Sequence, residues 1–595
     1  MIIAIRDGLR SLLPHLPSWA RRFLVQFSVL TALLALVDIA ALMLLALTLG
    51  AAASGGTLRV PVIGSIPMDL LPWLILVVVV VIIARSGLNL LLQWRATRRF
   101  AELERELGAR LFRSYIRADW STRLGSNTAR ILQISDTGVT NTIVGFLLPL
   151  STIPGVIATS VGTLLVISLA QPLTAAITLV YLGIIALVQY AVLTPKTRQA
   201  ARVVRNGALR MSTLVSGMVG AIKEITLRDK AGEAEATVAA ARARVAQARS
   251  NASFLGVVPR FVLDAALMGG FLLIGGVAFL SAPSGEEIPT AMISIAMFGV
   301  AGLRMVPSLA ALQAAMTRAG TALPYVERVL EDLNSPLSPE EATATDTSLT
   351  RATSDLVLSN VSFAYPGAST PAVRNVDLTI PLGTRIGVAG PSGAGKSTLI
   401  DLILGLLEPS DGQLRLDGED LSQHMAGWRA SVGYVPQDVA VFEGTIAQNI
   451  ALSWGDDVDM ERAEQAARRA QLWDVIEGRS GGLQGNVGER GTGLSGGQRQ
   501  RLGIARALYT DPLILVLDEA TSALDSHTES NVSDALDALG DEITVIAIAH
   551  RLSTIRNADA VVFMKDGRIQ AQGTFDEIVE KDADFRRQAE LAGLV

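Results

Sequence analysis

The chain has 595 residues, of which 50% are hydrophobic, with a mean hydropathy of +0.40 and a formal net charge of -5. This composition excludes an ordinary soluble protein, and so small a net charge gives no support to nucleic-acid binding. The absence of cysteine excludes disulfides and thiolate metal sites, and no two of the four histidines have metal-ligand spacing. Long apolar runs end near Leu312 and a mixed sequence begins after about Leu333, which predicts two domains in different solvents.

The first apolar run, Phe23 to Leu49, follows two arginines, as the core of a secretory signal does. It is about twice as long as a signal core of ~7–15 residues, so we interpret it as a membrane span. A bilayer core ~30 Å thick needs about 20 apolar residues in a helix. Six segments meet this requirement, at about 23–50, 70–94, 141–168, 173–194, 255–280 and 288–309.

The connections between these spans differ in charge. Residues 95–130 hold nine arginines and residues 195–254 hold eleven lysines or arginines, whereas 51–69 and 281–287 hold only Arg59. The positive-inside rule therefore predicts that both termini and both long connections are cytoplasmic. We expect the spans to lie in the inner membrane of the cell. Both long connections are rich in Ala, Glu, Arg and Leu, so we expect the membrane helices to continue into the cytoplasm.

We expect a transmembrane domain at 1–330, a linker rich in Pro, Ser, Thr and acids at 331–354, and an α/β P-loop nucleotide-binding domain at 355–595. Within the last, "RIGVAGPSGAGKSTLIDLILGLL" has a β-branched strand, a Gly-rich loop and an amphipathic helix in that order. Gly390 to Ser397 matches the pattern G-x-x-x-x-G-K-S. The pattern predicts phosphate binding by loop N–H groups, with Lys396 at the β- and γ-phosphates and Ser397 at Mg²⁺.

A second pattern, "LILVLDEATSALD", is typical of a buried parallel strand that ends in two carboxylates. Asp518 is suited to a direct or water-mediated Mg²⁺ contact, and Glu519 to orienting or activating the attacking water. An exposed acidic turn explains one acid at this place but poorly explains two. His550 follows a further apolar strand, "ITVIAIAH", at an end where open α/β sheets bind ligands, and we favour a γ-phosphate role over a structural one.

The sequence "LSGGQ", followed by "RQRLGIARAL", resembles the signature of ATP-binding-cassette (ABC) ATPases, and the other cassette motifs follow in the family's order. Tyr365 resembles the aromatic residue that stacks on adenine, and Gln437 resembles the sensor of the γ-phosphate and Mg²⁺. Asp525, in "SALD", resembles part of the loop across the dimer interface, and Glu489 resembles the exporter-type segment before the signature. The resemblance implies ATP and Mg²⁺ as cofactors.

The resemblance implies three groups of site residues. The catalytic group is Glu519, His550 and Gln437, and the metal-binding group is Ser397, Gln437 and Asp518. The nucleotide-binding group is Tyr365, Gly390, Pro391, Ser392, Gly393, Ala394, Gly395, Lys396, Ser397, Thr398, Ser495, Gly496, Gly497, Gln498 and Asp525.

The signature opens a helix, where Ser495 and glycine N–H groups suit an anion. In the family, it covers the nucleotide bound by a second cassette. One cassette and six spans per chain therefore imply a half-transporter that closes into a two-fold dimer. A homodimer is the simplest partner, and a heterodimer stays open.

The membrane half resembles the six-span exporter fold, with coupling segments near Trp120 and at Gly217 to Lys230. Within the exporters, "AIKEITL" and "GLRMVPSL" resemble bacterial lipid-linked oligosaccharide flippases of the N-glycosylation type. This implies ATP-driven movement of an amphiphilic lipid-linked oligosaccharide or glycolipid from the cytoplasmic leaflet outward by alternating access. A peptide or drug exporter shares the fold. From another class, an ATP-gated channel or a regulatory membrane ATPase remains an alternative, although complete catalytic motifs count against both.

Charges inside the spans need a reason, since one near the bilayer centre costs ~2.5–3.5 kcal/mol. At ~1.5 Å per residue, Arg85 and Arg304 lie at similar depth in the cytosolic third, and Asp38 lies nearer the outer half, so we expect no Asp38–Arg85 pair. In one interpretation both arginines reach the cytosolic interface, with Asp264 neutralising Arg260 or Arg304. In the other, Arg85 and Arg304 line a cavity and hold the pyrophosphate of a lipid-linked sugar.

Overall fold

The computed structural model describes residues 2–54, 58–60, 64–66, 71–124, 134–281, 287–334, 354–488, 491–518, 542–549 and 551–595. The chain divides into two compact units. The helical unit comprises Met1–Ala118 and Gly125–Leu337, and the α/β unit comprises Ser338–Val595 together with the short segment Asp119–Leu124.

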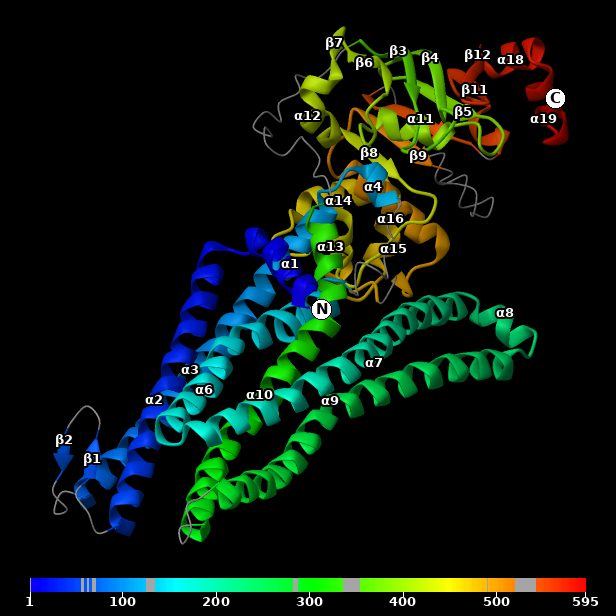
Figure 1. Cartoon of the computed structure of the whole chain (residues 1–595). Coiled ribbons are helices and arrows are strands. Elements are labelled where there is room, and N and C mark those ends of the chain that lie inside the picture. The colour runs from blue at the N-terminus through cyan, green and yellow to red at the C-terminus, as the bar shows by residue number, and fades with distance from the viewer. Residues whose placement is uncertain are drawn as a thin grey trace. The chain divides into compact units, whose positions relative to one another are not determined.

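The helical unit consists mainly of long helices (Figure 1). Its helices are α1 (Ile2–Leu12), η1 (Leu13–His15), α2 (Ser18–Ser54), α3 (Leu71–Ile116), η3 (Ile134–Gly138), η4 (Asn141–Leu147), α6 (Leu148–Ala170), α7 (Pro172–Gly220), α8 (Ile222–Leu227), α9 (Ala231–Ser281) and α10 (Glu287–Leu333). A small antiparallel hairpin, β1 (Leu58–Val60) and β2 (Gly64–Ile66), lies between α2 and α3. Over the described residues, six helical segments are long and apolar enough to cross a membrane, which confirms the six predicted spans.

Four of these helices are much longer than a bilayer is thick. α3, α7, α9 and α10 have 46, 49, 51 and 47 residues, and at 1.5 Å per residue they are roughly 70–77 Å long. The prediction that the basic connections continue the membrane helices is therefore confirmed. Glu331 to Leu333, expected in the linker, are helical instead, because Val326, Val329 and Leu330 still pack into the core of the helical unit.

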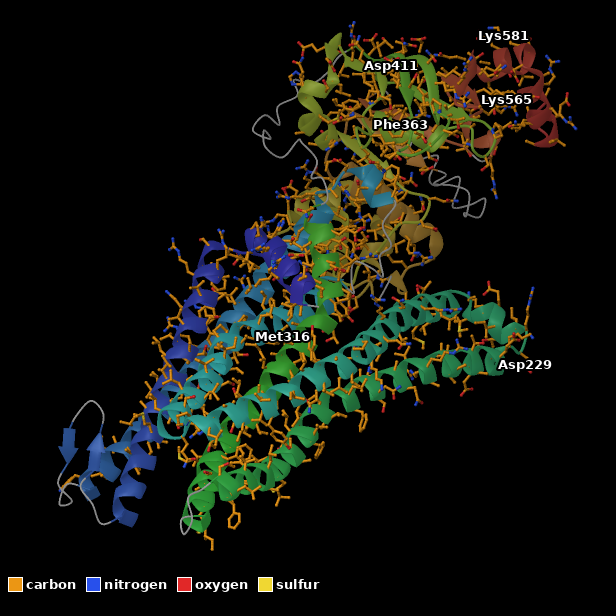
Figure 2. All side chains as sticks on the ribbon, viewed as in Figure 1. Asp229, Met316, Phe363, Asp411, Lys565 and Lys581 are labelled. Atoms are coloured by element: carbon orange, nitrogen blue, oxygen red, sulfur yellow. The ribbon has the colours of Figure 1, made fainter. Side chains whose placement is uncertain are left out.

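Helix packing inside this unit joins segments that are far apart in the sequence. α2 packs on α6, α10 packs on α6 and α9, and α7 runs back along α9 (Figure 1). Phe100 of α3 meets Phe23 and Phe27 of α2 edge to face, with ring centroids 5.9 and 6.3 Å apart. At the far end of the α7–α9 pair the chain turns through α8 and then Asp229, which has a left-handed φ of 51° (Figure 2).

The α/β unit contains two sheets. Its strands are β3 (Asp355–Phe363), β4 (Val373–Pro381), β5 (Arg385–Ala389), β6 (Asp411–Leu416), β7 (Glu419–Asp420), β8 (Val432–Val435), β9 (Ile514–Asp518), β10 (Thr544–Ile548), β11 (Ala560–Lys565) and β12 (Arg568–Gly573). The larger sheet has the order β12-β11-β5-β10-β9-β8, parallel except at β12, and the smaller antiparallel sheet has the order β4-β3-β6-β7. Leu515, Val516 and Ile546 are fully buried, as expected for parallel strands covered on both faces.

Helices cover the sheets of this unit. They are η6 (Leu421–His424), α11 (Lys396–Ile403), α12 (Met425–Ala430), α13 (Ile446–Ala451), α14 (Met460–Arg469), α15 (Trp473–Glu477), η7 (Gly482–Gln484), α16 (Gly496–Leu508), η10 (Leu552–Ile555), α18 (Phe575–Lys581) and α19 (Ala583–Leu591). Trp428 is fully buried and donates its indole N–H to the Ile403 carbonyl at 2.7 Å. The short helix α4 (Trp120–Leu124) belongs to the α/β unit, because Trp120 packs against the same core.

Candidate nucleotide site and membrane cavity

Four parallel strands of the larger sheet end at one edge, and the predicted nucleotide-binding residues follow them there. β5 leads into Gly390, β9 ends at Asp518, and β8 ends two residues before Gln437. β10 lies between β5 and β9, and its Ile548 is in register with both Val388 and Asp518. The topology therefore brings the phosphate loop and Asp518 to the same edge, as in other open α/β sheets that bind ligands there.

All three glycines of the phosphate loop have a positive φ, and at two of them a Cβ atom would also collide with backbone. Gly390 has a φ of 151°, and a Cβ there would lie 2.3 Å from the Met564 carbonyl oxygen. Gly395 has a φ of 95°, and a Cβ there would lie 2.4 Å from the Ala372 carbonyl oxygen. Gly395 is also the N-cap of α11, so the loop ends where unpaired helix N–H groups favour a phosphate.

Lys396 is positioned by the loop itself. Its Nζ donates to the carbonyl oxygens of Gly390 and Pro391 at 2.7 and 3.0 Å. Two residues further on, the Thr398 hydroxyl lies 3.2 Å from the Tyr365 hydroxyl, and the Tyr365 ring packs edge to face on Phe363. The contact places the ring of Tyr365 beside the start of α11, and thus beside the phosphate loop.

Asp518 lies in a cluster of acidic and phenolic groups. The Tyr434 hydroxyl donates to Asp518 Oδ2 at 3.1 Å. Burial, and then the negative charge of Asp518, raises the pKa of Tyr434. Burial, and secondarily the charge of Asp518, raises the pKa of Asp401 to about 6, although a hydrogen bond from Trp120 acts in the opposite direction. Asp401 and Asp518 thus lie near each other, and Asp401 is one turn after Ser397 on α11, a setting that suits Mg²⁺ with bound phosphates.

The described acids of this edge do not form a metal site by themselves. Across the described residues, no group of three or more His, Asp or Glu side chains could hold a metal ion. Mg²⁺ commonly binds through one or two protein oxygens together with substrate phosphates. Asp518 and Ser397, beside a phosphate loop, fit that mode of binding.

The signature residues begin α16. The Ser495 hydroxyl accepts from the Gln498 N–H at 3.3 Å, and the Gln498 side chain accepts from the Ser495 N–H at 3.0 Å, which makes a capping box. Gly496 and Gly497 form the first turn of the helix. From the same helix, Gln500 donates to the Pro436 carbonyl at 3.4 Å and so contacts the segment that carries the exposed Gln437.

Four predicted residues lie outside the described part of the chain. These are Glu489, Glu519, Asp525 and His550. β9 ends directly before Glu519, and β10 ends two residues before His550. The strands that precede these two residues therefore end at the same sheet edge as the phosphate loop.

Sequence reasoning missed Asp401 and Tyr434. Asp401 lies one helical turn after Ser397 in α11, and this spacing was a usable signal. Tyr434 lies on β8, and its contact with Asp518 depends on β8 and β9 being neighbours, which no local pattern reveals. The Trp120 indole also donates to Asp401 Oδ2, at 3.3 Å, so one predicted coupling segment touches the helix that follows the phosphate loop.

The helical unit holds a polar cavity of about 490 Å³ between four of its helices. Its lining residues are Thr31, Leu34, Ala35 and Asp38 of α2, Arg85, Asn89 and Gln93 of α3, Thr152, Gly155, Val156 and Thr159 of α6, and Leu303, Arg304, Pro307 and Ser308 of α10. Arg85, Asn89 and Gln93 are spaced four residues apart, which puts them on one face of α3. Both candidate substrate residues, Arg85 and Arg304, therefore line this cavity.

The expectation that Asp38 does not pair with Arg85 is wrong. Asp38 is only 5% exposed, its Oδ2 lies 3.6 Å from Arg85 Nη2, and it accepts a hydrogen bond from Arg304. The cause is a misplaced helix end, since α2 continues to Ser54 rather than about residue 50. Asp38, Arg85 and Arg304 lie ~21–26 Å along α2, α3 and α10, measured from the helix ends on the predicted outer side of the membrane.

Asp264 was expected to neutralise either Arg260 or Arg304, and the structure pairs it with Arg260. Asp264 lies 3.9 Å from Arg260, one turn away on α9, and both side chains are exposed. Arg304 pairs with Asp38 instead. One carboxylate therefore serves both cavity arginines, which leaves the cavity with one net positive charge.

Comparison with known proteins matches part of the α/β unit to a transporter domain, and the fold of nearly the whole chain to a solved structure. Residues 373–522 match the family model described as ABC transporter. The ATP-dependent lipid A-core flippase of Cupriavidus pinatubonensis is 41% identical over 267 residues, 44% of each chain. That of Escherichia coli K12 is 46% identical over 231 residues, 39% of this chain and 40% of the flippase. The chain thus aligns with less than half the length of these relatives.

A solved structure matches nearly the whole chain. A bacterial Atm1-family ABC exporter with ATP bound superposes with a TM-score of 0.75, covering 97% of this chain and 99% of the exporter. The two sequences are 22% identical, so the match shows a shared fold. ABC transporter domains use ATP with Mg²⁺, and the phosphate loop, Asp518 and the capped signature helix fit those cofactors.

Proposed function

We propose that this chain is an ATP-hydrolysing exporter of an amphiphilic lipid. The proposal is supported by its ABC transporter domain and its ABC exporter fold. Two copies act as a dimer of half-transporters in the inner membrane, with both termini and the ATP-binding domain in the cytoplasm. The cargo is a lipid-linked oligosaccharide or glycolipid, moved outward from the cytoplasmic leaflet by alternating access. The observation that carries this proposal is the arginine-lined cavity inside a membrane unit fused to an ATP-binding domain.

The proposed roles in ATP hydrolysis follow from the sheet edge. Lys396 neutralises the β- and γ-phosphates, while Ser397 and Asp518 hold Mg²⁺, which offsets the charge of the same phosphates. Glu519 orients or activates the attacking water, and His550 contacts the γ-phosphate. Because catalysis of phosphoryl transfer is mostly positioning and charge stabilisation, these few groups are sufficient.

The remaining roles are divided between the nucleotide of the chain's own cassette and the nucleotide of a second copy. Tyr365 stacks on adenine and Gln437 contacts Mg²⁺, while Ser495 and its neighbours cover the nucleotide held by the partner. Support for a dimer comes from α8, whose Ile222 and Leu227 are 57% and 86% exposed at the end of the α7–α9 pair. Apolar side chains on a cytosolic helix suit a docking contact, and the occupant we propose is the second copy of this chain.

The proposed cargo is derived from the cavity. Arg85 and Arg304 lie in a membrane environment, where charges are retained for function, and the guanidinium group matches phosphate oxygens in two-point hydrogen bonds. The cavity also offers amides and hydroxyls from Asn89, Gln93 and Ser308. A phosphate-bearing lipid head with polar sugars fits both features. The relatives named lipid A-core flippases support a lipid cargo.

The first test is stimulation of ATPase activity. Purified protein in proteoliposomes is measured against lipid-linked sugars, glycolipids and peptides. We expect the phosphate-bearing lipids to stimulate hydrolysis and neutral glycolipids to do so weakly. Strong stimulation by peptides alone would replace the lipid cargo with a peptide cargo.

The second test separates a pump from a channel. A Glu519→Gln variant should bind ATP and hydrolyse it very slowly, because the water is no longer activated. A pump then loses sustained transport, whereas an ATP-gated channel stays open for longer. Prolonged ion conductance through Glu519→Gln in planar bilayers would overturn the exporter proposal.

A further inference from the structure

The charged group in the membrane cavity contains one acid that the proposed transport reaction does not use. The Asp38 side chain is 6% exposed, compared with 27% for Arg85 and 34% for Arg304. Both guanidiniums contact its Oδ2 atom. This buried carboxylate contacts two arginine partners, so it occupies donors that a bound anion would use.

Asp38 does not satisfy all of those donors. Two guanidiniums carry more N–H groups than one carboxylate can accept. Among the described residues, Arg85 Nε is buried without a hydrogen-bond partner. The side chains that line the cavity in each copy therefore keep one net positive charge, and Arg85 keeps one buried N–H group without a partner.

We infer that Asp38 is a resident counter-anion that competes with the anionic head of the cargo for Arg85 and Arg304, and so allows the cargo to be released. This inference rests on the proposed function, because it takes a phosphate-bearing lipid as the cargo. When the head binds, the two guanidiniums exchange Asp38 oxygens for phosphate oxygens. When transport moves the helices, Asp38 recovers its partners and the head loses them.

Competition and a purely structural role of Asp38 predict opposite changes in the affinity for anionic ligands when Asp38 is replaced. If Asp38 only held α2 to α3 and α10, its loss would loosen the cavity and weaken binding of every ligand. If Asp38 competes with the head, its loss leaves two guanidiniums without an internal anion. Anionic ligands then bind more tightly and leave more slowly, while an uncharged ligand is unaffected.

The test uses three ligands with one tail, namely farnesyl diphosphate, farnesyl monophosphate and farnesol. Dissociation constants and maximal stimulated ATPase rates are measured for the full-length protein in phosphatidylcholine nanodiscs. For Asp38→Asn we expect roughly tenfold tighter binding of farnesyl diphosphate, a smaller gain for the monophosphate and none for farnesol. The maximal stimulated rate should fall, because release becomes slow.

Two further variants keep the result interpretable. Asp38→Glu retains the charge and should resemble the wild type. The double variant Asp38→Asn with Arg304→Gln restores one net positive charge and should return the affinity for farnesyl diphosphate toward the wild-type value. Equal or weaker binding of farnesyl diphosphate by a folded Asp38→Asn protein would overturn the inference alone. If the wild-type protein binds farnesyl diphosphate no better than farnesol, the anionic cargo itself is wrong, and the role of Asp38 is lost with it.

Discussion

The two units of the molecule hold their functional groups in different ways. In the α/β unit they follow the ends of strands, where the backbone of a glycine loop and a helix N-terminus supply much of the binding. In the helical unit the proposed cargo-binding groups are single side chains that lie along long helices and line the cavity. A short sequence motif therefore specifies the first site, while the second depends on which faces of four helices meet.

The largest effect is expected in the α/β unit. Lys396→Ala should lower ATPase activity by roughly 10²–10³-fold, because one preorganised charge at the transferred phosphate is lost. The rate is measured by phosphate release from proteoliposomes. Lys581→Ala is the matched control, since Lys581 is 66% exposed on α18 (Figure 2) and should have no effect. Equal losses in both variants would mean that the phosphate loop has been misassigned.

The next effect separates the two units. Arg304→Gln and Arg85→Gln should each reduce lipid-stimulated ATPase activity by roughly tenfold or more, because a charge-assisted hydrogen bond contributes ~1.5–3 kcal/mol. Basal ATPase activity should stay within about twofold of the wild type, since neither residue belongs to the α/β unit. Arg328→Gln, which removes an exposed ion pair with Glu331 on α10, serves as the control. A fall in basal and stimulated activity by the same factor would contradict a role in cargo binding.

A smaller effect is expected on the pH dependence of stability. Asp401 has a pKa raised from 3.8 to about 6, mainly by burial, so the folded chain binds more protons than the unfolded chain between these values. Stability should therefore fall as the pH rises from about 4 to 6, and the loss should persist above pH 6. Asp401→Asn should remove this loss and stabilise the protein at pH 7.5 by about 1 kcal/mol, allowing for partial exposure.

Thermal unfolding of the full-length protein in detergent at pH 5 and pH 7.5 measures this difference. The quantity compared is the change in Tm between the two pH values, for Asp401→Asn and for the wild type. A larger drop in Tm toward neutral pH in the variant would show that the charge of Asp401 stabilises the fold.

An effect on stability of similar size is expected at two helix caps. Ser495→Ala and Thr574→Ala each break a capping box, at α16 and α18, and each should cost about 1 kcal/mol. Only Ser495→Ala should also lower ATPase activity, because Ser495 is proposed to cover the nucleotide of the partner. The two variants are compared by thermal unfolding and phosphate release. Full activity in a folded Ser495→Ala protein would remove that residue from the nucleotide site.

The two units also differ in how well the sequence predicted them. The phosphate loop was predicted residue by residue, because Gly390 and Gly395 adopt backbone angles that few other residues allow. The six spans were predicted because hydropathy alone decides them. The Asp38–Arg85 pair was not predicted, because a shift of four residues in one helix end moves a charge by ~6 Å along the membrane normal.

Contacts across the sheet were equally hidden in the sequence. The hydrogen bond from Tyr434 to Asp518 requires that β8 lie beside β9, although α13, α14, α15 and α16 separate the two strands in the sequence. The contact of Trp120 with Asp401 joins residues that are 281 positions apart. A local sequence pattern predicts which ligand a segment binds. Long-range packing decides which other side chains contact the acids of that segment.

The most direct measurement is ATP-dependent movement of a polyprenyl-diphosphate-linked sugar across proteoliposome membranes. The sugar is labelled, and the fraction accessible to an added enzyme or quencher is followed after Mg²⁺ and ATP are supplied. We predict movement by the wild-type protein, none with Glu519→Gln, and at least roughly tenfold slower movement with Arg304→Gln. Equal rates for wild type and Arg304→Gln, or movement without ATP hydrolysis, would contradict the link between the arginine-lined cavity and the ATP-binding domain.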